Sequence, residues 1–597
     1  MQPKVMSRLP TPNFHAVHWQ HRAAWQHSWH ALETSFGCGE SFVHTLQAWQ
    51  RDANAPDRLF FTALTADTPS HVHPLIAAEC FGLLPGVHRI VFVQGRVQLT
   101  LCIGPLQKIA REIDIAADSL RIDDANTLGA KQTCRLCKRG TNIVWTEPTA
   151  AQSHEWLKAG VQMNSATTGT YQPAWTPKSS LRSDSEYASP LIQKNPSSAQ
   201  IHGKTKHAVV IGAGLSGAAA AYSLATRGWR VDVLDQGPEM GAGASGLPAG
   251  IFATHVSPDN NVLSRITRDG VRATLHRARL LLQEGTHWQL SQLLEHRYAG
   301  KRELPSGRQW PAAGHAWSTQ ASVTQKLAGG LDEDTKALWH PLAGWIQPLA
   351  FVKAQLTHPN ITWRGNCHVA QLEKDRSQWL ALDVNGQCMV RSELMVLANA
   401  HACQNLLNSV SCSDNANAET RPHLPATALR GQVTWGAMKD LPEKLRLALP
   451  TFPVNGHGSY IGHLTLPQAD QKDQQWLVGS SFQRNDFDLT TRTEDLQSNL
   501  QQWAELMPAL KDEIHHKIDT QATHSWAAIR SALPDRVPAV GEFTHPDFKG
   551  LHVCTGMGAR GISWSVLCGE LLTANIELEP LPMAATLAKR MAASRFG

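Results

Sequence analysis

The stretch that decides the fold is Val209-Val210-Ile211-Gly212-Ala213-Gly214-Leu215-Ser216-Gly217. An apolar strand runs into a glycine turn, and a helix of small residues follows from Ala218. Gly212 permits the tight turn, Gly214 lets the backbone approach a pyrophosphate, and Gly217 lets the helix pack closely on the strand. The helix N-terminus offers free N–H groups to phosphates. The pattern therefore predicts a dinucleotide-binding turn.

A second strand with a terminal acid, Val231-Asp232-Val233-Leu234-Asp235, completes this unit. Asp235 is suited to a ribose 2′-hydroxyl, because an acid ends the second strand of such units. Glycine turns alone are common, and a βαβ turn without a ligand is the alternative. The two strands, the helix and the acid in register favour dinucleotide binding.

The composition bounds the class of protein. A chain of 597 residues is too long for one hydrophobic core, so two to four domains are expected. No apolar run is long enough for a membrane span, and no apolar signal region follows Met1, so we expect a cytoplasmic protein. The net charge of +5 permits a polyanionic partner such as RNA.

The cysteines indicate reduced thiols. There are 11, scattered along the chain, and a chain without a secretory signal keeps them free. Cys134 and Cys137 form a CxxC pair, but no second pair or nearby His pair completes a zinc site. No metal is predicted.

Residues 165–206 separate two parts of the chain. Ser, Thr, Pro and Gln dominate them, and apolar periodicity is absent, which is typical of a linker. We therefore predict an α/β protein with an N-terminal domain over residues 1–164, a linker over 165–206 and a C-terminal part over 207–597.

The C-terminal part is predicted to hold two sheets. Residues 394–400 have the pattern of a buried strand that ends in small residues, and residues 550–558 return to a strand and a second glycine turn. A helix over residues 565–574 follows, so the dinucleotide-binding Rossmann domain is expected to be discontinuous. Residues 431–435 and 476–479 are predicted as strands of an antiparallel, substrate-facing domain.

Three features favour a flavin over a nicotinamide. The loop at residues 243–250 is rich in small residues and can pass close to an isoalloxazine ring. Residues 555–561 precede a helix whose dipole can face the flavin edge on which negative charge develops. The strand ending at residues 398–400 is a predicted wall of the cofactor cleft. FAD is the predicted cofactor, bound by Gly212, Gly214, Gly217, Asp235, Ser245, Gly246, Val369, Gly556, Gly558 and Gly561.

Four motifs carry a resemblance: Ala244-Ser245-Gly246-Leu247-Pro248-Ala249-Gly250, Val256-Ser257-Pro258-Asp259-Asn260, Pro534-Asp535-Arg536-Val537-Pro538 and Gly556-Met557-Gly558-Ala559-Arg560-Gly561. The C-terminal part resembles the D-amino-acid-oxidase-like flavoprotein family, which includes glycine and sarcosine oxidases. These motifs more closely resemble the oxidoreductase half of the bifunctional tRNA 5-methylaminomethyl-2-thiouridine biosynthesis proteins.

The resemblance implies an amine oxidation on tRNA. This family removes the carboxymethyl group from 5-carboxymethylaminomethyl-2-thiouridine at the wobble position and leaves 5-aminomethyl-2-thiouridine. FAD takes a hydride from the carbon between nitrogen and carboxylate, and the protein binds and orients the two partners. The implied macromolecular partner is tRNA, and we expect a monomer.

Three residues are the predicted catalytic set. A guanidinium is the best partner for the substrate carboxylate, and Arg530 occupies the place where related amine oxidases hold theirs. Arg560 is the second choice, with a flavin contact as its other possible role. Tyr460 is predicted to line the pocket, with ordinary core packing as the alternative. The alternative role for Arg530 is a structural ion pair with a carboxylate of the protein.

A second glycine turn lies in the N-terminal part. Residues 33–42 read Glu-Thr-Ser-Phe-Gly-Cys-Gly-Glu-Ser-Phe, and such a turn can receive the methionine part of S-adenosylmethionine. They resemble the methyltransferase motif of the same family, with departures at Ser35, Cys38, Glu40 and Ser41. The resemblance implies a diverged, Rossmann-like methyltransferase domain.

Two parts of that methyltransferase pattern are missing. The acid expected after the strand at residues 59–64 is absent, since Asp67 stands two positions late. Only Asp123-Asp124-Ala125-Asn126 remains of an Asp-Gly-Phe-Ala-Pro run near the methyl-transfer centre, and the segment looks shortened. A lost carboxylate costs about 1–3 kcal/mol of cofactor binding. A working S-adenosylmethionine-dependent methyltransferase and a degenerate domain that packs or docks tRNA both stay open, and the residues favour impaired activity.

Two other functions compete with tRNA oxidation. An FAD-dependent oxidase of free glycine, sarcosine or a D-amino acid would present the same amine beside a carboxylate. A flavin-bearing binding protein without turnover is the third class. The four motifs and the attached N-terminal part favour tRNA.

Overall fold

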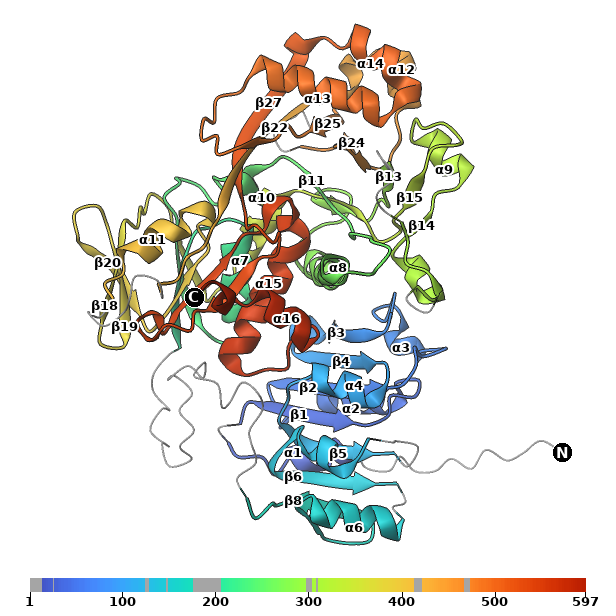
Figure 1. Ribbon diagram of the computed structural model, residues 1–597, viewed down its shortest axis with the longest axis vertical. Coiled ribbons are helices and arrows are strands. Elements are labelled where there is room, and N and C mark those ends of the chain that lie inside the picture. Colours follow the sequence, from blue (N-terminus) through green and yellow to red (C-terminus); the bar gives the residue numbers. More distant parts are fainter. Residues whose placement is uncertain are drawn as a thin grey trace, which may run out of the picture. The chain divides into compact units, whose positions relative to one another are not determined.

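The computed structural model describes residues 13–24, 26–123, 128–146, 149–175, 206–296, 303–307, 310–412, 421–466 and 473–597. The chain divides into two compact units (Figure 1). Unit 1 contains Met1–Ala188 and Leu578–Thr586, and unit 2 contains Ser189–Glu577 and Leu587–Gly597. Each unit has its own sheets and apolar core, as a chain of this length requires.

Unit 1 is built on one eight-stranded sheet in the order β3-β4-β2-β1-β5-β6-β8-β7 (Figure 1). The five strands β4, β2, β1, β5 and β6 run parallel, and β3, at one edge, is antiparallel to β4. All seven residues of β4 are buried, because helices cover both faces of a parallel sheet. The strands are β1 Ser28–Glu33, β2 Arg58–Thr65, β3 Gly86–Phe92, β4 Val97–Ile103, β5 Ala117–Ile122 and β6 Cys137–Trp145.

The sheet of unit 1 continues beyond its predicted end at residue 164. β7 (Val161–Met163) pairs antiparallel with β8 (Thr168–Tyr171), and β8 pairs antiparallel with β6. The linker therefore begins after β8 and not at residue 165. The four residues of β8 are short and polar, so apolar periodicity could not mark them as a strand. Residues 176–205 of the predicted linker lie outside the described residues.

A segment from the far end of the sequence also belongs to unit 1. The backbone N–H and the hydroxyl of Thr586 donate to Glu112 Oε2 at 3.0 and 2.7 Å. Arg89 on β3 donates to the carbonyl oxygen of Pro580. The predicted C-terminal part, residues 207–597, is therefore interrupted at Leu578–Thr586.

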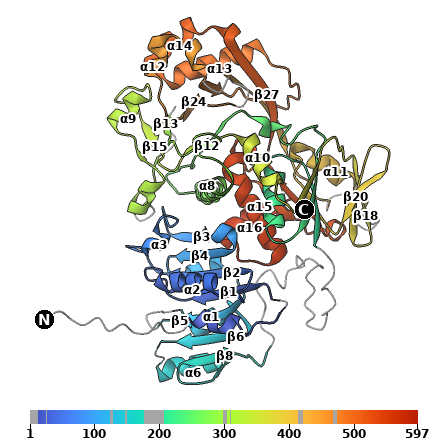
Figure 2. The ribbon, with the colours of Figure 1, turned by 180° about the vertical axis from the view of Figure 1, so that it is seen from behind.

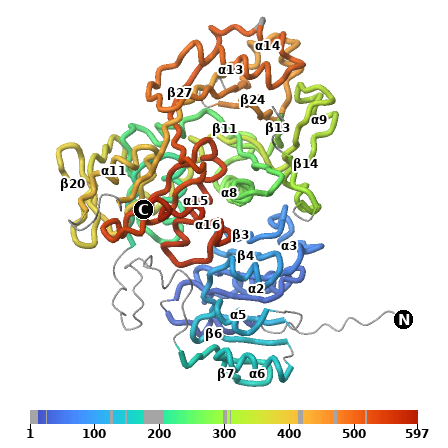
Figure 3. Tube along the Cα trace, viewed as in Figure 1, coloured from blue at the N-terminus to red at the C-terminus, as the bar shows by residue number. Residues whose placement is uncertain are grey.

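Unit 2 contains the predicted dinucleotide-binding sheet, with six strands in the order β17-β10-β9-β21-β29-β28. β9 pairs in parallel with both β10 and β21, and β21 pairs in parallel with β29, which comes more than 150 residues later. The domain is discontinuous, as the sequence predicts, and the red C-terminal chain lies next to earlier, green segments of unit 2 in Figure 3. The strands are β9 His207–Ile211, β10 Arg230–Leu234, β17 Ile361–Arg364, β21 Leu394–Leu397, β28 Ala539–Glu542 and β29 Leu551–Thr555.

Two helices pack closely on this sheet. α7 (Leu215–Ala225) follows the glycine turn, and α15 (Gly561–Glu577) follows β29. A Cβ at Gly569 would lie 2.5 Å from the carbonyl oxygen of Ala219, so the two helix backbones nearly touch. Small residues at the contact permit this approach.

The second large sheet of unit 2 has nine strands and is predominantly antiparallel. The strands predicted at residues 431–435 and 476–479 lie in β22 and β25, which pair antiparallel as expected. β22 also pairs antiparallel with β27. α13 (Thr493–Leu506) packs against β22, β24 and β25, and Figure 2 shows it with α12 and α14. The strands used below are β13 Leu294–His296, β15 Ala337–Trp339, β22 Thr427–Ala437, β24 Gly458–Leu464, β25 Gln475–Gly479 and β27 Thr523–Ala532.

Candidate active site

The first glycine turn of unit 2 has no room for side chains. A Cβ at Gly217 would lie 1.8 Å from the carbonyl oxygen of Gly212, and one at Gly212 would lie 2.6 Å from that of Ala398. Gly212 also has a φ of +108°, which favours glycine. Gly212 and Gly214 lie between β9 and α7, and Gly217 lies in the first turn of α7, which is the spacing of a pyrophosphate-binding turn.

The acid after the second strand is tied to this turn. Asp235 Oδ2 accepts from the backbone N–H of Ala213 at 2.6 Å, and Oδ1 accepts from that of Gly237 at 2.8 Å. The backbone N–H of Cys367 donates to the carbonyl oxygen of Asp235 at 2.8 Å, so the chain leading to Val369 passes beside the acid. Val369 itself is buried in the core of this sheet. These contacts hold Asp235 against the glycine turn, and Val369 follows shortly after the segment that contacts this acid.

Ser245 caps the helix that follows the turn. Its hydroxyl accepts from the backbone N–H of Leu215 at 2.9 Å, although it is 30 residues away in sequence. Its Oγ would also lie 3.0 Å from a Cβ at Gly214. The loop at residues 243–250 therefore lies against the N-terminus of α7, and Gly246 is next to Ser245 on it.

The second glycine turn lies between β29 and α15. Gly556 has a φ of +81°, and a Cβ there would lie 2.6 Å from Leu533 Cδ1. Gly558 has a φ of +56°, and Gly561 is the first residue of α15. The hydroxyl of Thr555 donates to the carbonyl oxygen of Ala400 at 3.0 Å, which joins this turn to the end of β21. The glycines and the acid predicted to bind FAD thus come together at the carboxyl ends of β9, β10 and β29. The glycine turn at the N-terminus of α7 fits the pyrophosphate of FAD.

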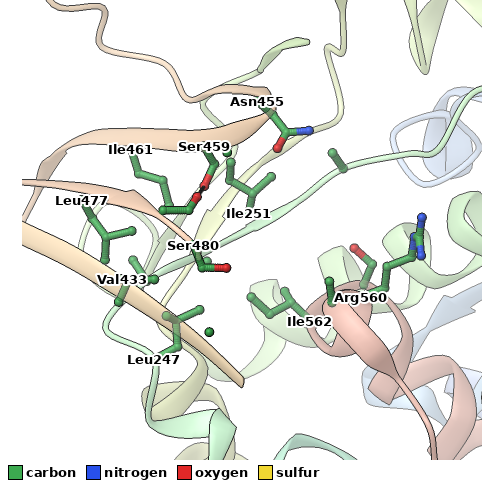
Figure 4. Close-up of a pocket in the computed structure, with 18 of the residues that line it drawn as sticks. Leu247, Ile251, Val433, Asn455, Ser459, Ile461, Leu477, Ser480, Arg560 and Ile562 are labelled. Carbon is green, nitrogen blue, oxygen red and sulfur yellow. Dashed lines mark hydrogen bonds between the residues drawn. The ribbon is translucent and has the colours of Figure 1, made fainter. Parts of the chain in front are cut away.

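A cavity of about 490 Å³ opens where the glycine segments meet the nine-stranded sheet. In Figure 4, Ser459 and Ser480 line it from the strands, and Arg560 and Ile562 line it from the other side. Leu247 and Ile251 belong to the loop that follows Ser245. The cavity is therefore formed by segments that are far apart in the sequence.

Arg530 lines this cavity from β27. Its Nη2 donates to Ser480 Oγ at 3.0 Å, and its guanidinium carbon lies 5.7 Å from the ring of Phe482. Burial lowers the pKa of Arg530. In the described part of the chain, no carboxylate lies within 4 Å of this guanidinium, so the predicted alternative of a structural ion pair is not seen there. A cation in this setting is ready to receive an anion.

Of the other two predicted catalytic residues, one lines the cavity and the other is buried in the core. Arg560 lines the cavity, and its guanidinium carbon lies 5.3 Å from the ring of Trp564. Tyr460 is fully buried and stacks on Trp503, 5.5 Å between ring centroids, so it does not line the pocket. Side chains alternate along β24, and Ser459 faces the cavity while Tyr460 points to the core under α13. The core-packing alternative for Tyr460 is the correct one.

A buried polar chain on the cavity wall escaped the sequence analysis. His340 Nε2 lies 2.9 Å from Glu295 Oε2, and its Nδ1 lies 2.7 Å from Ser318 Oγ. Glu295 and His340 both line the cavity and are 5% and 1% exposed. They lie on or next to the paired strands β13 and β15, 45 residues apart. The available signal was a lone acid in the apolar run before His296.

In unit 1, a buried carboxylate before the glycine turn is bound by side chains of the same unit. Glu33, the last residue of β1, is 4% exposed, and its Oε1 accepts from Ser41 Oγ at 2.5 Å. The same oxygen lies 3.2 Å from His15 Nε2. Neither Glu33 nor His15 was predicted as a site residue, although an acid four positions before Gly37 was a usable signal. This carboxylate is already engaged inside the protein.

The end of β2 does not supply the acid that a bound S-adenosylmethionine ribose requires. β2 ends at Thr65, whose hydroxyl donates to the carbonyl oxygen of Asp67 at 2.9 Å. Asp123 is described and its N–H donates to Thr34 Oγ1 at 3.1 Å, whereas residues 124–126 of the predicted remnant lie outside the described residues. The described donor set of unit 1 therefore fits S-adenosylmethionine only in part.

The CxxC cysteines are buried thiols. Burial raises the pKa of Cys134 to about 12 and that of Cys137 well above its usual value. Within the described ranges, no group of three or more His, Cys, Asp or Glu side chains is arranged to hold a metal ion. Among those same residues, no helix combines the length and apolar character needed to cross a membrane.

Comparison with known families matches unit 2. A family model described as FAD dependent oxidoreductase matches residues 207–575. This range includes both glycine turns and every residue named above as lining the cavity.

Comparison with individual proteins extends the match to nearly the whole chain. The tRNA 5-methylaminomethyl-2-thiouridine biosynthesis bifunctional protein MnmC of Polaromonas sp. is 38% identical over 95% of this chain and 91% of its own length. The protein of the same name from Polaromonas naphthalenivorans is 37% identical over 94% of this chain and 89% of its own length. Among solved structures, glycine oxidase from Geobacillus kaustophilus aligns with 63% of this chain and 96% of its own, at 19% identity and a TM-score of 0.47. The two relatives span both units.

Proposed function

The chain belongs to the family of tRNA 5-methylaminomethyl-2-thiouridine biosynthesis bifunctional proteins, and we propose that unit 2 removes the carboxymethyl group from 5-carboxymethylaminomethyl-2-thiouridine in tRNA. The protein is an FAD-dependent oxidoreductase that modifies the wobble uridine of tRNA. The observation that carries the detailed proposal is Arg530, a cation that faces the cavity beside the predicted flavin site.

FAD, when bound, supplies the hydride acceptor for the carbon between the substrate nitrogen and carboxylate, and hydrolysis of the resulting imine gives glyoxylate and the aminomethyl uridine. Gly212, Gly214 and Gly217 would lie along the pyrophosphate, with Asp235 at the ribose. Gly556 and Gly558 would lie along the flavin ring, where the N-terminus of α15 favours negative charge.

Arg530 would bind the substrate carboxylate. A guanidinium offers parallel N–H donors that match the two oxygens of a carboxylate. Ser480 accepts one N–H of Arg530 and so limits its rotation. The carboxylate would thereby be fixed on the β27 side of the cavity, and the carbon beside it would be oriented for oxidation.

Glu295 and His340 would act on the substrate nitrogen. A secondary amine must lose its extra proton before its carbon can give up a hydride, because the nitrogen lone pair has to be free. His340 accepts or donates through Nε2 toward Glu295 and through Nδ1 toward Ser318, so a proton can be held within this buried chain. An acid and a cation on the walls of one cavity suit a substrate that carries both an ammonium and a carboxylate.

The test uses the full-length flavoprotein in rapid mixing experiments. We expect tRNA that carries 5-carboxymethylaminomethyl-2-thiouridine to bleach the flavin absorbance and to release glyoxylate. The matched control is the same tRNA without the carboxymethylaminomethyl group, which should leave the flavin oxidised. Bleaching by free sarcosine or glycine but not by tRNA would reverse the choice of substrate. A flavin that no substrate bleaches would indicate a binding protein without turnover.

Unit 1 is proposed to be the methyltransferase half in a weakened form. Its strand order and glycine turn support a place for S-adenosylmethionine. The engaged carboxylate of Glu33 and the position of Thr65 support weak binding. The competing interpretation, a fully working methyltransferase, is favoured by the bifunctional name of the relatives. Titration of the full-length protein with S-adenosylmethionine separates the two.

The working environment is proposed to be the cytoplasm, because tRNA is the substrate, and the working form is proposed to be a monomer. Light scattering during size-exclusion chromatography, with and without tRNA, tests the second point. A stable dimer would contradict it.

A further inference from the structure

A loop beside the cavity presents three large apolar side chains to solvent. This segment, Ser480–Arg492, runs from β25 to α13 and includes the short strand β26 (Gln483–Arg484), which pairs with β22; it is called the aromatic loop below. Phe482, Phe487 and Leu489 are 54%, 59% and 56% exposed. Among the residues that the structure describes, Phe482 and Phe487 are the only phenylalanines that are more than half exposed. Apolar surface of this kind, concentrated in one loop, is a mark of a binding site.

The exposure does not come from a loosely held backbone. Arg430 on β22 is fully buried and donates to the carbonyl oxygens of Asp488 at 2.5 Å and Thr490 at 2.6 Å. The backbone N–H of Asn485 donates to the carbonyl oxygen of Ala428 at 2.8 Å. Arg492 pairs with Asp486 at 2.6 Å. The aromatic loop is therefore held at several points, and its side chains are presented in a defined place.

The aromatic loop is continuous with the proposed active site. Phe482 lines the cavity, and its ring lies 5.7 Å from the guanidinium carbon of Arg530. The ring of Phe487 lies 5.6 Å from that of His401, at an interplanar angle of 61°. His401 comes just after β21, at the edge of the six-stranded sheet where the cofactor residues gather. Phe482 therefore belongs to the cavity wall, and Phe487 lies outside the cavity beside His401.

The aromatic loop also carries one exposed cation that could contact a phosphate. Asp486 and Asp488 are both paired with Arg492, at 2.6 and 2.9 Å. Arg484 is exposed, and in the described part of the chain no carboxylate pairs with it. Arg484 therefore stands between the two exposed phenylalanines in the sequence.

We infer that Phe482 and Phe487 are stacking platforms for the bases that flank the modified uridine in the tRNA anticodon loop, with Arg484 beside the phosphates. This inference rests on the proposed function. A uridine drawn into a closed cavity loses its stacking neighbours in the RNA, and those neighbours need new surfaces to stack on. Single-stranded bases stack on aromatic side chains whatever their sequence, since every base has a π face. A fixed, exposed phenylalanine offers such a face next to the cavity.

The test compares tRNA with the free modified nucleoside on the full-length flavoprotein. Phe487→Ala is the main variant, because Phe487 does not line the cavity. We expect it to weaken tRNA binding, measured by fluorescence anisotropy, by roughly 5- to 100-fold. The KM for tRNA should rise by the same factor, while flavin bleaching by the free nucleoside and the rate at saturating tRNA stay unchanged. Phe487→Trp should restore binding, and Phe487→Leu should not.

The matched control is Leu447→Ala on α12 (Glu443–Ala448), since Leu447 is 76% exposed and does not line the cavity. It should leave tRNA binding unchanged. Equal loss of tRNA and nucleoside turnover in Phe487→Ala, full retention of tRNA affinity, or rescue by Phe487→Leu would each overturn the inference. Retained tRNA affinity together with loss of a protein partner would assign the surface to protein binding instead. If wild-type flavin is not bleached by any modified tRNA, the proposed function itself fails.

Discussion

The two units of this protein each place a glycine turn after the first strand of a parallel sheet, yet they treat the nearby acid differently. In unit 2, both oxygens of Asp235 accept backbone N–H groups of the turn region, from Ala213 and Gly237. In unit 1, the buried acid is Glu33, which precedes its turn and is engaged by side chains, Ser41 and His15. The acid of unit 2 is thus held by backbone N–H groups, and the acid of unit 1 by side chains. Two similar strand–turn–helix segments therefore differ in how their acids are held, which makes their cofactor binding worth comparing by experiment.

The largest expected effect is on cofactor binding, when one glycine in the turn of each unit is replaced by alanine. In Gly217→Ala the new Cβ would lie 1.8 Å from the Gly212 carbonyl oxygen, so the turn must move. A clash of this kind costs at least about 3 kcal/mol, which corresponds to a roughly 100-fold or greater loss of FAD affinity. In Gly37→Ala the Cβ meets open space and only the φ of +57° opposes it, at a cost of about 1 kcal/mol.

Flavin content of the purified variants, read from visible absorbance, measures this difference. Gly217→Ala should be colourless, and Gly37→Ala should be as yellow as the wild type. Wild-type flavin content in Gly217→Ala would show that FAD does not depend on this turn.

The next effect tests whether the cavity of unit 2 holds a carboxylate. Arg530→Ala removes charge-assisted hydrogen bonds that contribute about 1.5–3 kcal/mol, so the KM for modified tRNA should rise roughly 10- to 150-fold. FAD content should stay the same, because Arg530 lies on β27 and not on the cofactor turns. Arg530→Lys keeps the charge without the paired donors and should fall between the two. Unchanged kinetics in Arg530→Ala would remove it from the site.

A smaller effect tests whether unit 1 lacks only an acid. Thr65→Asp places a carboxylate at the end of β2. The comparable acid of unit 2 is Asp235, which comes directly after the end of β10. If the missing acid explains weak binding, S-adenosylmethionine affinity by calorimetry should rise about tenfold, since one added charge-assisted hydrogen bond contributes at least ~1.5 kcal/mol. Tight binding by the wild-type protein would favour the fully working methyltransferase. Thr65→Ser is the matched control, and it should bind as the wild type does.

The smallest effect concerns a buried histidine of unit 2 and the pH dependence of the stability of that unit. Burial lowers the pKa of His552 on β29, with nearby Glu542 acting in the opposite direction. The unfolded chain then binds a proton more readily than the folded one, so stability is complete above pH ~6.5 and is lost as the pH falls below it. The loss is at most about 1.4 kcal/mol per pH unit.

Calorimetric unfolding between pH 7 and pH 5.5 checks this point. His552→Gln should reduce the acid sensitivity of the unit 2 transition and leave the unit 1 transition unchanged. Equal acid sensitivity in the variant and the wild type would contradict the role of His552.

Several elements of unit 2 were predictable because their signals are local. The strands at residues 209–211, 231–234, 394–397 and 551–555 are short apolar runs bounded by glycine or an acid, and the structure has them. β8 was not predictable in this way, because Thr168-Gly169-Thr170-Tyr171 is polar and gains its place only from pairing with β6 and β7. Tyr460 shows a second limit. Neighbouring residues of a strand face opposite sides, so an error of one position moves a side chain from the cavity to the core.

The amino-acid sequence by itself determined the dinucleotide turn and its acid, because a tight turn, a close helix contact and a strand end each demand particular residue types within about 25 neighbours. Only the tertiary structure decided which side chains share the cavity. Arg530, Ser480, Glu295 and His340 come from strands and loops up to 235 residues apart, and the folding of the nine-stranded sheet brings them to one cavity. No local pattern encodes such a meeting, since it depends on the register of several strands at once.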